Sequence, residues 1–189
     1  MSTLYIPVIL GTARDGRKSE HVVPFVLDAL ENTDGVETEL IDIRDFPIDK
    51  TKPSWEDHEE TKEWKEKADK ADAFFIITPE YNHGYPGELK LFLDSAYKEY
   101  FYKPVALAGV SSGRISGGRV LEHLKPILIE MGMVVLKDHL YFGNIGDIID
   151  ENGELIDSEG KLTKQLDVII ERLVVFAHGL APVREKLLN

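Results

Sequence analysis

The chain has 189 residues, of which 43% are hydrophobic and 30% charged, and this composition predicts an ordinary globular protein with one domain over residues 1–189. Its formal net charge of −12 disfavours nucleic acid or an anionic membrane as the main partner, because both bind basic surfaces. The chain has no cysteine, which excludes disulfides, thiolate nucleophiles and cysteine-ligated metal centres. Any redox chemistry therefore requires a bound cofactor.

The start of the chain has neither a basic region nor a secretory apolar core. No apolar run approaches the roughly 20 residues that a membrane-spanning helix needs. We therefore expect a cytoplasmic protein with no membrane partner.

The first part of the chain alternates apolar runs with helical patterns. Residues 4–10 form a nearly continuous apolar run, which is typical of a strand buried on both faces. Apolar spacing predicts a helix over residues 19–33, and residues 36–43 resemble a second strand. A polar, proline-containing segment at 45–60 predicts an irregular excursion, and residues 62–71 predict a polar helix.

The alternation continues to the end of the chain. Further strands are expected at 72–78, 104–110 and 133–136, and further helices at 87–97, 117–131 and 162–177. Pro126 lies inside one of these helices and predicts a kink or a break there. The Asn-Gly step within residues 150–155 predicts a small hairpin.

Five alternations of strand and helix predict an α/β fold with a parallel sheet covered by helices on both faces. Right-handed crossovers leave few topologies, and for five strands the flavodoxin-like order 2-1-3-4-5 is the common one. The expected architecture is therefore a three-layer sandwich around a five-stranded sheet.

The first, third and fourth strands each end in a glycine-containing loop, and a parallel sheet brings these loops to its carboxyl edge. The first loop has hydroxyls at Thr12 and Ser19 and positive charges at Arg14, Arg17 and Lys18. Such groups beside the start of a helix predict a phosphate site. Alternatively, Ser19 only caps the helix and the basic side chains are solvated. The loop matches neither Gly-x-Gly-x-x-Gly nor Walker A.

The second loop, residues 79–87, contains an aromatic ring, an amide and several backbone amides, which suit a flat heteroaromatic ligand with polar edges. Alternatively, it is a proline-started turn in which Tyr81 packs as ordinary core. His83 titrates near neutrality, but a loop histidine is more often a surface group. Glu80 has no partner carboxylate at a suitable spacing. We assign a catalytic role to neither residue.

The third loop, residues 111–119, contains glycines that permit close backbone approach, or it is simply a flexible connection. The six histidines lack the spacing of metal-ligand motifs, so no metal site is predicted.

The motifs of the three loops occur in a fixed order. They are Gly11-Thr12-Ala13-Arg14 with Ser19; Pro79-Glu80-Tyr81-Asn82 with Pro86-Gly87-Glu88-Leu89-Lys90 and Asp94; and Ser111-Ser112-Gly113 with Gly117-Gly118. Together they resemble the NADPH-dependent FMN reductase family of the flavodoxin-like superfamily, over roughly residues 4 to 140. Three departures are a longer first loop, Leu91 in place of asparagine and Ser95 in place of tryptophan.

The resemblance implies FMN as cofactor, NADPH or NADH as electron donor, a small-molecule electron acceptor, and a homodimer or homotetramer. The acceptors of such proteins are quinones, azo dyes, nitro compounds, metal ions or oxygen. The implied FMN contacts are Thr12, Arg14, Arg17, Ser19, His21 and Val22 at the phosphate; Pro79, Glu80, Tyr81, Asn82 and Gly84 at the ring; and Ser111, Gly113 and Gly118 on its other side. No catalytic side chain is assigned, because a flavin carries its own hydride chemistry.

The leading hypothesis is therefore an FMN-dependent NAD(P)H oxidoreductase. One alternative is a non-enzymatic flavodoxin-like electron carrier, which the acidic composition favours because carriers often dock on basic partners. A second alternative is a flavin-binding redox sensor. Direct reduction of bound flavin by a nicotinamide nucleotide distinguishes the enzyme from both alternatives.

Overall fold

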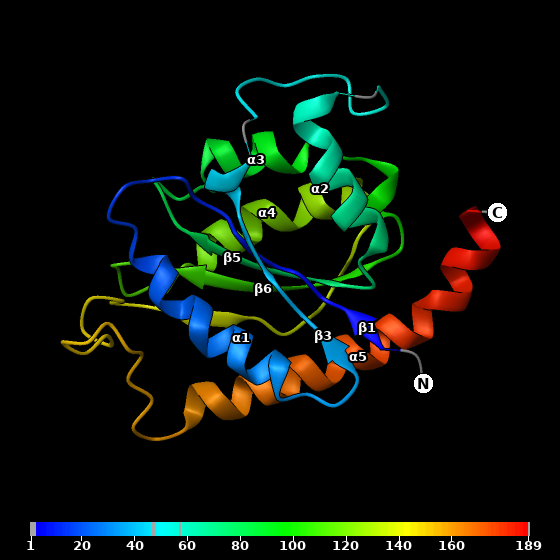
Figure 1. Cartoon of the computed structure of the whole chain (residues 1–189). Helices are drawn as coiled ribbons and strands as arrows, with labels where there is room; N and C mark the ends of the chain where they lie inside the picture. Colours follow the sequence, from blue (N-terminus) through cyan, green and yellow to red (C-terminus); the bar gives the residue numbers. More distant parts are fainter. Residues whose placement is uncertain (1–2, 47, 57, 189) are drawn as a thin grey trace.

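The computed structural model describes residues 3–46, 48–56 and 58–188. A parallel sheet runs through the centre of the protein, and helices cover both of its faces (Figure 1). The helices α1 (Val23–Glu31) and α5 (Lys161–Leu188) cover one face. The helices α2 (Glu59–Lys70), α3 (Gly87–Leu93) and α4 (Gly118–Glu130) cover the other. The expected α/β class is confirmed.

The main path of the sheet has the order β4-β2-β5-β6-β7, with β8 also paired to β6, and all of these pairings are parallel. The remaining strands, β1 and β3, pair with each other. The bounds are β1 Leu4–Tyr5, β2 Val8–Leu10, β3 Val36–Glu37, β4 Leu40–Asp42, β5 Phe74–Pro79, β6 Pro104–Val110, β7 Val134–Val135 and β8 Leu140–Phe142.

The division into short strands differs from the five continuous strands that the sequence predicts. The first predicted strand is interrupted between Tyr5 and Val8, where Pro7 has no N–H to donate to a neighbouring strand. The fifth is reduced to β7, and after residues 136–139 the chain pairs again with β6 as β8. The apolar pattern of the sequence did not predict β8 as a separate strand.

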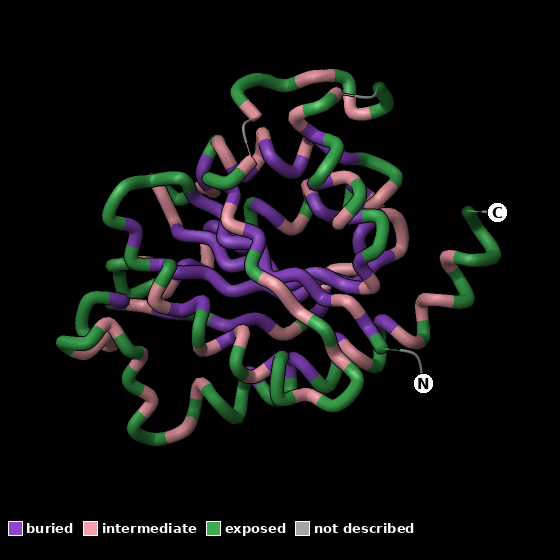
Figure 2. Tube along the Cα trace, in the orientation of Figure 1, coloured by how far each residue is buried: buried purple, intermediate pink, exposed green. Residues whose placement is uncertain are grey.

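The central strands are buried on both faces. Every residue of β5 and β6 is buried, and successive side chains of β5 point to opposite cores. Phe75 and Ile77 pack toward α1 and α5, whereas Phe74 and Ile76 pack toward Trp64 of α2. Figure 2 shows this buried centre between exposed outer helices. Thr78 is the only polar side chain in β5 and β6, so we expect the site at the ends of these strands.

The helices differ from expectation at their boundaries. The helix predicted over 19–33 begins as a 3-10 helix, η1 (Lys18–Val22), before α1. The helix α3 stops at Leu93, whereas α5 continues eleven residues beyond the predicted end at residue 177. The helix α4 runs through Pro126 without a break.

The irregular regions are largely as the sequence predicts. The excursion after β4 contains one 3-10 turn, η2 (Ile43–Asp45), and another, η3 (Lys98–Tyr100), follows α3. Pro47 and Asp57 of this excursion lie outside the described residues. The predicted hairpin is confirmed by the antiparallel bridge between Ile149 and Leu155, with Gly153 at a φ of 85°.

A contact between two glycines fixes the third loop against the sheet. A Cβ atom on Gly109 of β6 would lie 2.5 Å from the carbonyl oxygen of Gly117, which itself has a φ of +77°. Only a residue without a side chain fits at either position. The turn that leads into α4 therefore depends on this glycine pair.

We predict that Gly109→Ala lowers the free energy of unfolding by about 1–3 kcal/mol, because the new methyl group meets backbone that has no room to move. Gly87→Ala is the matched control, since nothing lies within 4 Å of a Cβ atom at that position. Denaturant unfolding of both variants measures the difference. Equal stability of the two variants would show that the loop tolerates the methyl group.

Candidate functional site

Residues from the three glycine-containing loops line one cleft of about 250 Å³ at the carboxyl edge of the sheet. Its lining residues are Arg14, Gly16, Arg17, Lys18 and Ser19; Pro79, Glu80 and Tyr81; and Val110, Ser111, Ser112 and Ile145. The sequence analysis missed Ile145, which follows β8. Its backbone N–H donates to the carbonyl of Ser111, and this contact between distant segments leaves no local signal in the sequence.

The second loop folds into a tight turn. Tyr81 and Gly84 exchange two backbone hydrogen bonds of 2.9 Å, and the residues between them, Asn82 and His83, have φ angles of 50° and 70°. Two successive positive φ angles are typical of a type I′ turn. Because neither residue is glycine, the turn holds backbone strain of the kind that concentrates at binding sites.

Tyr81 joins the second loop to the first. Its hydroxyl lies 3.0 Å from Oγ1 of Thr12, and the guanidinium of Arg14 lies 5.5 Å from the centre of its ring. Thr12 is fully buried, and its hydroxyl also donates to Glu88 and accepts from the backbone N–H of Arg14. The alternative that Tyr81 is ordinary core is therefore wrong, because the side chain bridges two loops at the cleft.

Arg17 closes the first loop onto the end of β4. The buried guanidinium donates to both carboxylate oxygens of Asp42 and to the carbonyl of Thr12, and its Nε lies 3.4 Å from Glu20. Burial alone raises the pKa of Asp42, but the hydrogen bonds from Arg17 and Arg44 outweigh it and lower the pKa to about 2. We name this contact the Arg17–Asp42 clasp. The clasp uses the guanidinium N–H donors of Arg17, which the sequence analysis assigned to a phosphate.

The side chain of His21 also makes its contact outside the cleft. Its Nδ1 lies 2.9 Å from the carbonyl oxygen of Gly153, which ties η1 to the turn at residues 150–155. Val22 at the end of η1 is fully buried in the core. Neither residue lines the cleft.

Ser19 has the feature expected of a ligand contact. The residue is only 1% exposed, and its hydroxyl has no hydrogen-bond partner among the described residues. It does not cap the helix, which corrects the capping alternative. A buried hydroxyl without a partner costs free energy that a bound acceptor would recover. Arg14 and Lys18 supply positive charge along the same cleft, so an anion suits this position.

Glu80 is the second buried group with an unsatisfied oxygen. Its side chain is 7% exposed, Oε1 lies 3.4 Å from a guanidinium nitrogen of Arg119, and Oε2 has no partner among the described residues. In the same cleft, the hydroxyl of Ser111 accepts a 3.0 Å hydrogen bond from the backbone N–H of Gly113. The cleft therefore offers an unpartnered hydroxyl at Ser19 and an unpartnered carboxylate oxygen at Glu80.

The structure brings together half of the residues that the resemblance implies. Those that line the cleft are Arg14, Arg17, Ser19, Pro79, Glu80, Tyr81 and Ser111. Those that do not line it are Thr12, His21, Val22, Asn82, Gly84, Gly113 and Gly118.

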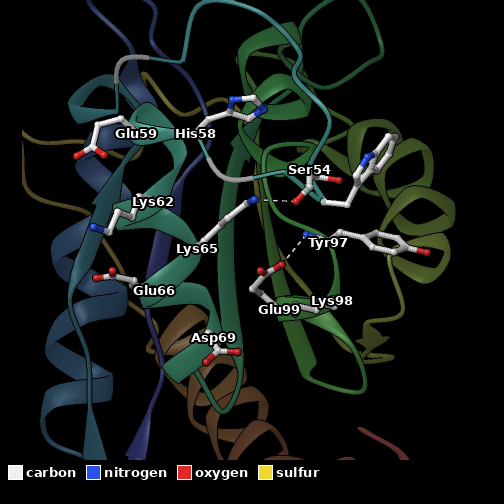
Figure 3. A pocket seen from close by; sticks show the side chains of 11 residues that line it. Ser54, His58, Glu59, Lys62, Lys65, Glu66, Asp69, Tyr97, Lys98 and Glu99 are labelled. Atoms are coloured by element: carbon white, nitrogen blue, oxygen red, sulfur yellow. Dashed lines mark hydrogen bonds between the residues drawn. The ribbon is translucent and has the colours of Figure 1, made fainter.

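A larger cleft of about 710 Å³ lies elsewhere, between α2 and residues 97–99 (Figure 3). Two of its charged side chains bind the protein's own backbone. Lys65 donates to the carbonyls of Ser54 and Glu56, and Glu99 accepts from the backbone N–H of Tyr97. No residue of the three glycine-containing loops lines it. Size alone does not make this cleft the active site, since convergent polar groups mark such sites.

In the described part of the chain, no group of three histidine, aspartate or glutamate side chains is arranged to hold a metal ion. None of the described helices combines the length and apolar character needed to cross a membrane.

A family model described as NADPH-dependent FMN reductase matches residues 4–147. The chain belongs to this family. An NAD(P)H-dependent FMN reductase of Schizosaccharomyces pombe is 32% identical over 130 residues, which cover 65% of this chain and 64% of that protein. The FMN-dependent NADPH-azoreductase of Staphylococcus aureus is 28% identical over 181 residues, covering 91% of this chain and 94% of that protein.

Among solved structures, the flavoenzyme NAD(P)H:(acceptor) oxidoreductase FerB from Paracoccus denitrificans has a TM-score of 0.77 and 24% identity, covering 94% of this chain and 98% of that one. This likeness concerns the fold. Family membership confirms the leading hypothesis: the protein is an NAD(P)H-dependent oxidoreductase that uses FMN.

We predict that the Arg17–Asp42 clasp makes stability depend on pH. Folding lowers the pKa of Asp42 from 3.8 to about 2, so its contribution of about 2 kcal/mol is complete above pH 3.8 and is lost as the pH falls toward 2. Asp42→Asn should be less stable at neutral pH and should lose stability less steeply over this range. Denaturant unfolding at a series of pH values measures how steeply the free energy of unfolding falls with pH for the wild type and for Asp42→Asn. Asp34→Asn, at an exposed position, is the control. Parallel curves for wild type and Asp42→Asn would contradict the prediction.

Proposed function

We propose that FMN binds in the cleft at the carboxyl edge of the sheet, with its phosphate at Ser19, Arg14 and Lys18. The observation that carries this proposal is the buried hydroxyl of Ser19, which has no partner among the described residues and lies in a cleft with two cationic side chains. A phosphate oxygen accepts from a hydroxyl and from a guanidinium, and its charge suits both cations.

The residues around the rest of the cleft suit the flavin ring. The strained turn from Tyr81 to Gly84 would lie along one edge of the ring, and the third loop with Ser111, Gly113 and Gly118 on its other side. The free oxygen of Glu80 offers an acceptor for a ring N–H. The cleft is slightly smaller than the roughly 300 Å³ at which ligand pockets begin, so part of the ring would remain open to a second substrate.

FMN bound in this cleft would supply the chemistry of hydride transfer from a nicotinamide and of onward electron transfer. The chain itself positions the cofactor. Thr12 and Tyr81 hold the first two loops together, and the Arg17–Asp42 clasp fixes the start of η1 so that Ser19 stays in the cleft. In this proposal Thr12, Arg17 and His21 shape the phosphate site rather than touch the phosphate. We assign no catalytic side chain.

The electron acceptor in this proposal is a small molecule such as a quinone, an azo or nitro compound, a metal ion or oxygen, and the protein is a homodimer or homotetramer. We also propose that β1 with β2, β3 with β4, and β7 with β8 are divided single strands. Counted in this way, the observed path corresponds to the flavodoxin-like order 2-1-3-4-5.

The visible spectrum of the FMN-loaded protein under nitrogen tests the function. We expect the oxidised flavin band to bleach promptly after NADPH or NADH is added, and the faster nucleotide identifies the preferred donor. A band that neither nucleotide changes would contradict the reductase and favour a carrier or a sensor. A stable one-electron semiquinone on stepwise photoreduction would then support the carrier.

We predict that Ser19→Ala weakens FMN binding about tenfold, the equivalent of one hydrogen bond to a charged group, and leaves riboflavin binding unchanged. Riboflavin is the comparison ligand because it lacks the phosphate. Fluorescence titration of both flavins measures the affinities. Ser95→Ala, a buried serine that donates to the carbonyl of Phe92 away from the cleft, controls for general effects of removing a buried hydroxyl.

Arg14→Ala should likewise weaken FMN more than riboflavin, because only FMN has the negative charge that the guanidinium neutralises. The same titrations measure this effect. An equal loss for both flavins would refute a phosphate contact and would point instead to the packing of Arg14 over Tyr81.

A further inference from the structure

Glu80 places a carboxylate deep in the wall of the cleft. Its side chain is 7% exposed, compared with 13% for Asp42 in the Arg17–Asp42 clasp. Arg17 donates to both oxygens of Asp42, whereas Arg119 reaches only Oε1 of Glu80, at 3.4 Å, and leaves Oε2 without a partner among the described residues. A buried carboxylate that is only half paired is costly. The contact between Glu80 and Arg119 is therefore a poor candidate for a purely stabilising ion pair.

Arg119 occupies an unfavourable position in its own helix. It is the second residue of α4, and the N-terminal end of a helix carries partial positive charge, which favours acidic side chains and disfavours cations. The first turn of α4 has no acidic side chain that would offset this charge. Among the described residues, the guanidinium has one carboxylate partner, which is Glu80. A cation at this position is therefore explained by Glu80 and not by the helix.

The backbone at both residues is anchored to the end of β6. The N–H of Glu80 donates a 2.8 Å hydrogen bond to the carbonyl of Val110. The close contact between Gly109 and Gly117 holds the start of α4, two residues before Arg119. The separation of the two backbone positions is therefore set by the sheet.

We propose that Arg119 is a positioning residue that sets the reduction potential of bound FMN by balancing the charge of Glu80. This inference rests on the proposed function, which places the flavin ring beside Glu80. Arg119 does not line the cleft, so it acts through Glu80 and does not touch the cofactor.

The charge that accompanies reduction gives the pair its effect. A hydride from NAD(P)H carries two electrons and one proton, so the ring gains one negative charge and the nucleotide leaves as NAD(P)⁺. A carboxylate beside the ring opposes this gain of charge, and a guanidinium next to the carboxylate offsets the opposition. The partly paired state of Glu80 then leaves Oε2 free for a ring N–H while Arg119 compensates its charge.

The midpoint potential of bound FMN, measured without oxygen against a reference dye, tests the proposal. Arg119→Ala leaves the carboxylate unbalanced, so reduced FMN should bind about tenfold more weakly relative to oxidised FMN. This change in the ratio lowers the two-electron potential by about 30 mV. Glu80→Gln removes the negative charge with little change of shape and should raise the potential. The double variant removes both charges and should return the potential toward the wild-type value.

Two further variants control for other effects. Arg119→Lys keeps the positive charge and should restore most of the wild-type potential. Arg172→Ala removes a partly exposed arginine that pairs with Asp138 and does not line the cleft. It should leave the potential unchanged, because it breaks a similar ion pair away from the proposed flavin site.

Two results would overturn the role of Arg119. A purely structural pair would change the binding of oxidised and reduced FMN equally, so the potential would stay the same in every variant. An equal shift from Arg119→Ala with and without Glu80→Gln would show that the guanidinium does not act through the carboxylate.

Titration of Ser19→Ala with oxidised FMN separates these failures from a failure of the proposed function. If Ser19→Ala weakens FMN binding but the potentials do not move, the phosphate site stands and the role of Arg119 is refuted. If changes at Ser19, Glu80 and Arg119 alter neither the affinity nor the potential, FMN binds elsewhere and both proposals are refuted.

Discussion

The burial of β5 and β6 on both faces is the constraint on which the rest of the structure depends. Because helices cover the sheet on both sides, every side chain within these strands except Thr78 is apolar, and the polar groups of the cleft lie at or beyond the strand ends. Parallel pairing then brings the ends of β2, β5 and β6 to one edge. The site is therefore assembled from segments that lie far apart in the sequence, each anchored by a strand with little freedom to move.

Side-chain contacts hold those segments in place and leave selected groups unpaired. The Arg17–Asp42 clasp and the Thr12–Tyr81 hydrogen bond satisfy several polar groups of the first two loops. Within the described residues, the hydroxyl of Ser19 and one oxygen of Glu80 stay buried without partners. A fold normally satisfies such groups, and their presence along one cleft is the reason for proposing that a ligand completes them.

The sequence predicts the strands, the helices and the placement of the three loops well. Local backbone geometry sets both the spacing of apolar residues in each element and the positions where glycine is needed. It does not predict which polar side chains contact each other. Arg17 and Arg14 look equivalent in the sequence, yet one is buried against Asp42 and the other lies over Tyr81. The partner of Arg17 is 25 residues away, so only the folded chain distinguishes the two. Pro126 predicts a break that packing against the sheet overrides. The contribution of Ile145 depends on β8, which the apolar pattern did not reveal.

A crystal structure of the FMN-loaded protein tests the central claim most directly. We expect the phosphate within hydrogen-bond distance of the Ser19 hydroxyl, the ring along residues 79–84, and Arg17 still bound to Asp42. Flavin bound in the larger cleft between α2 and residues 97–99, or a phosphate held by Arg17 after the clasp has opened, would contradict it.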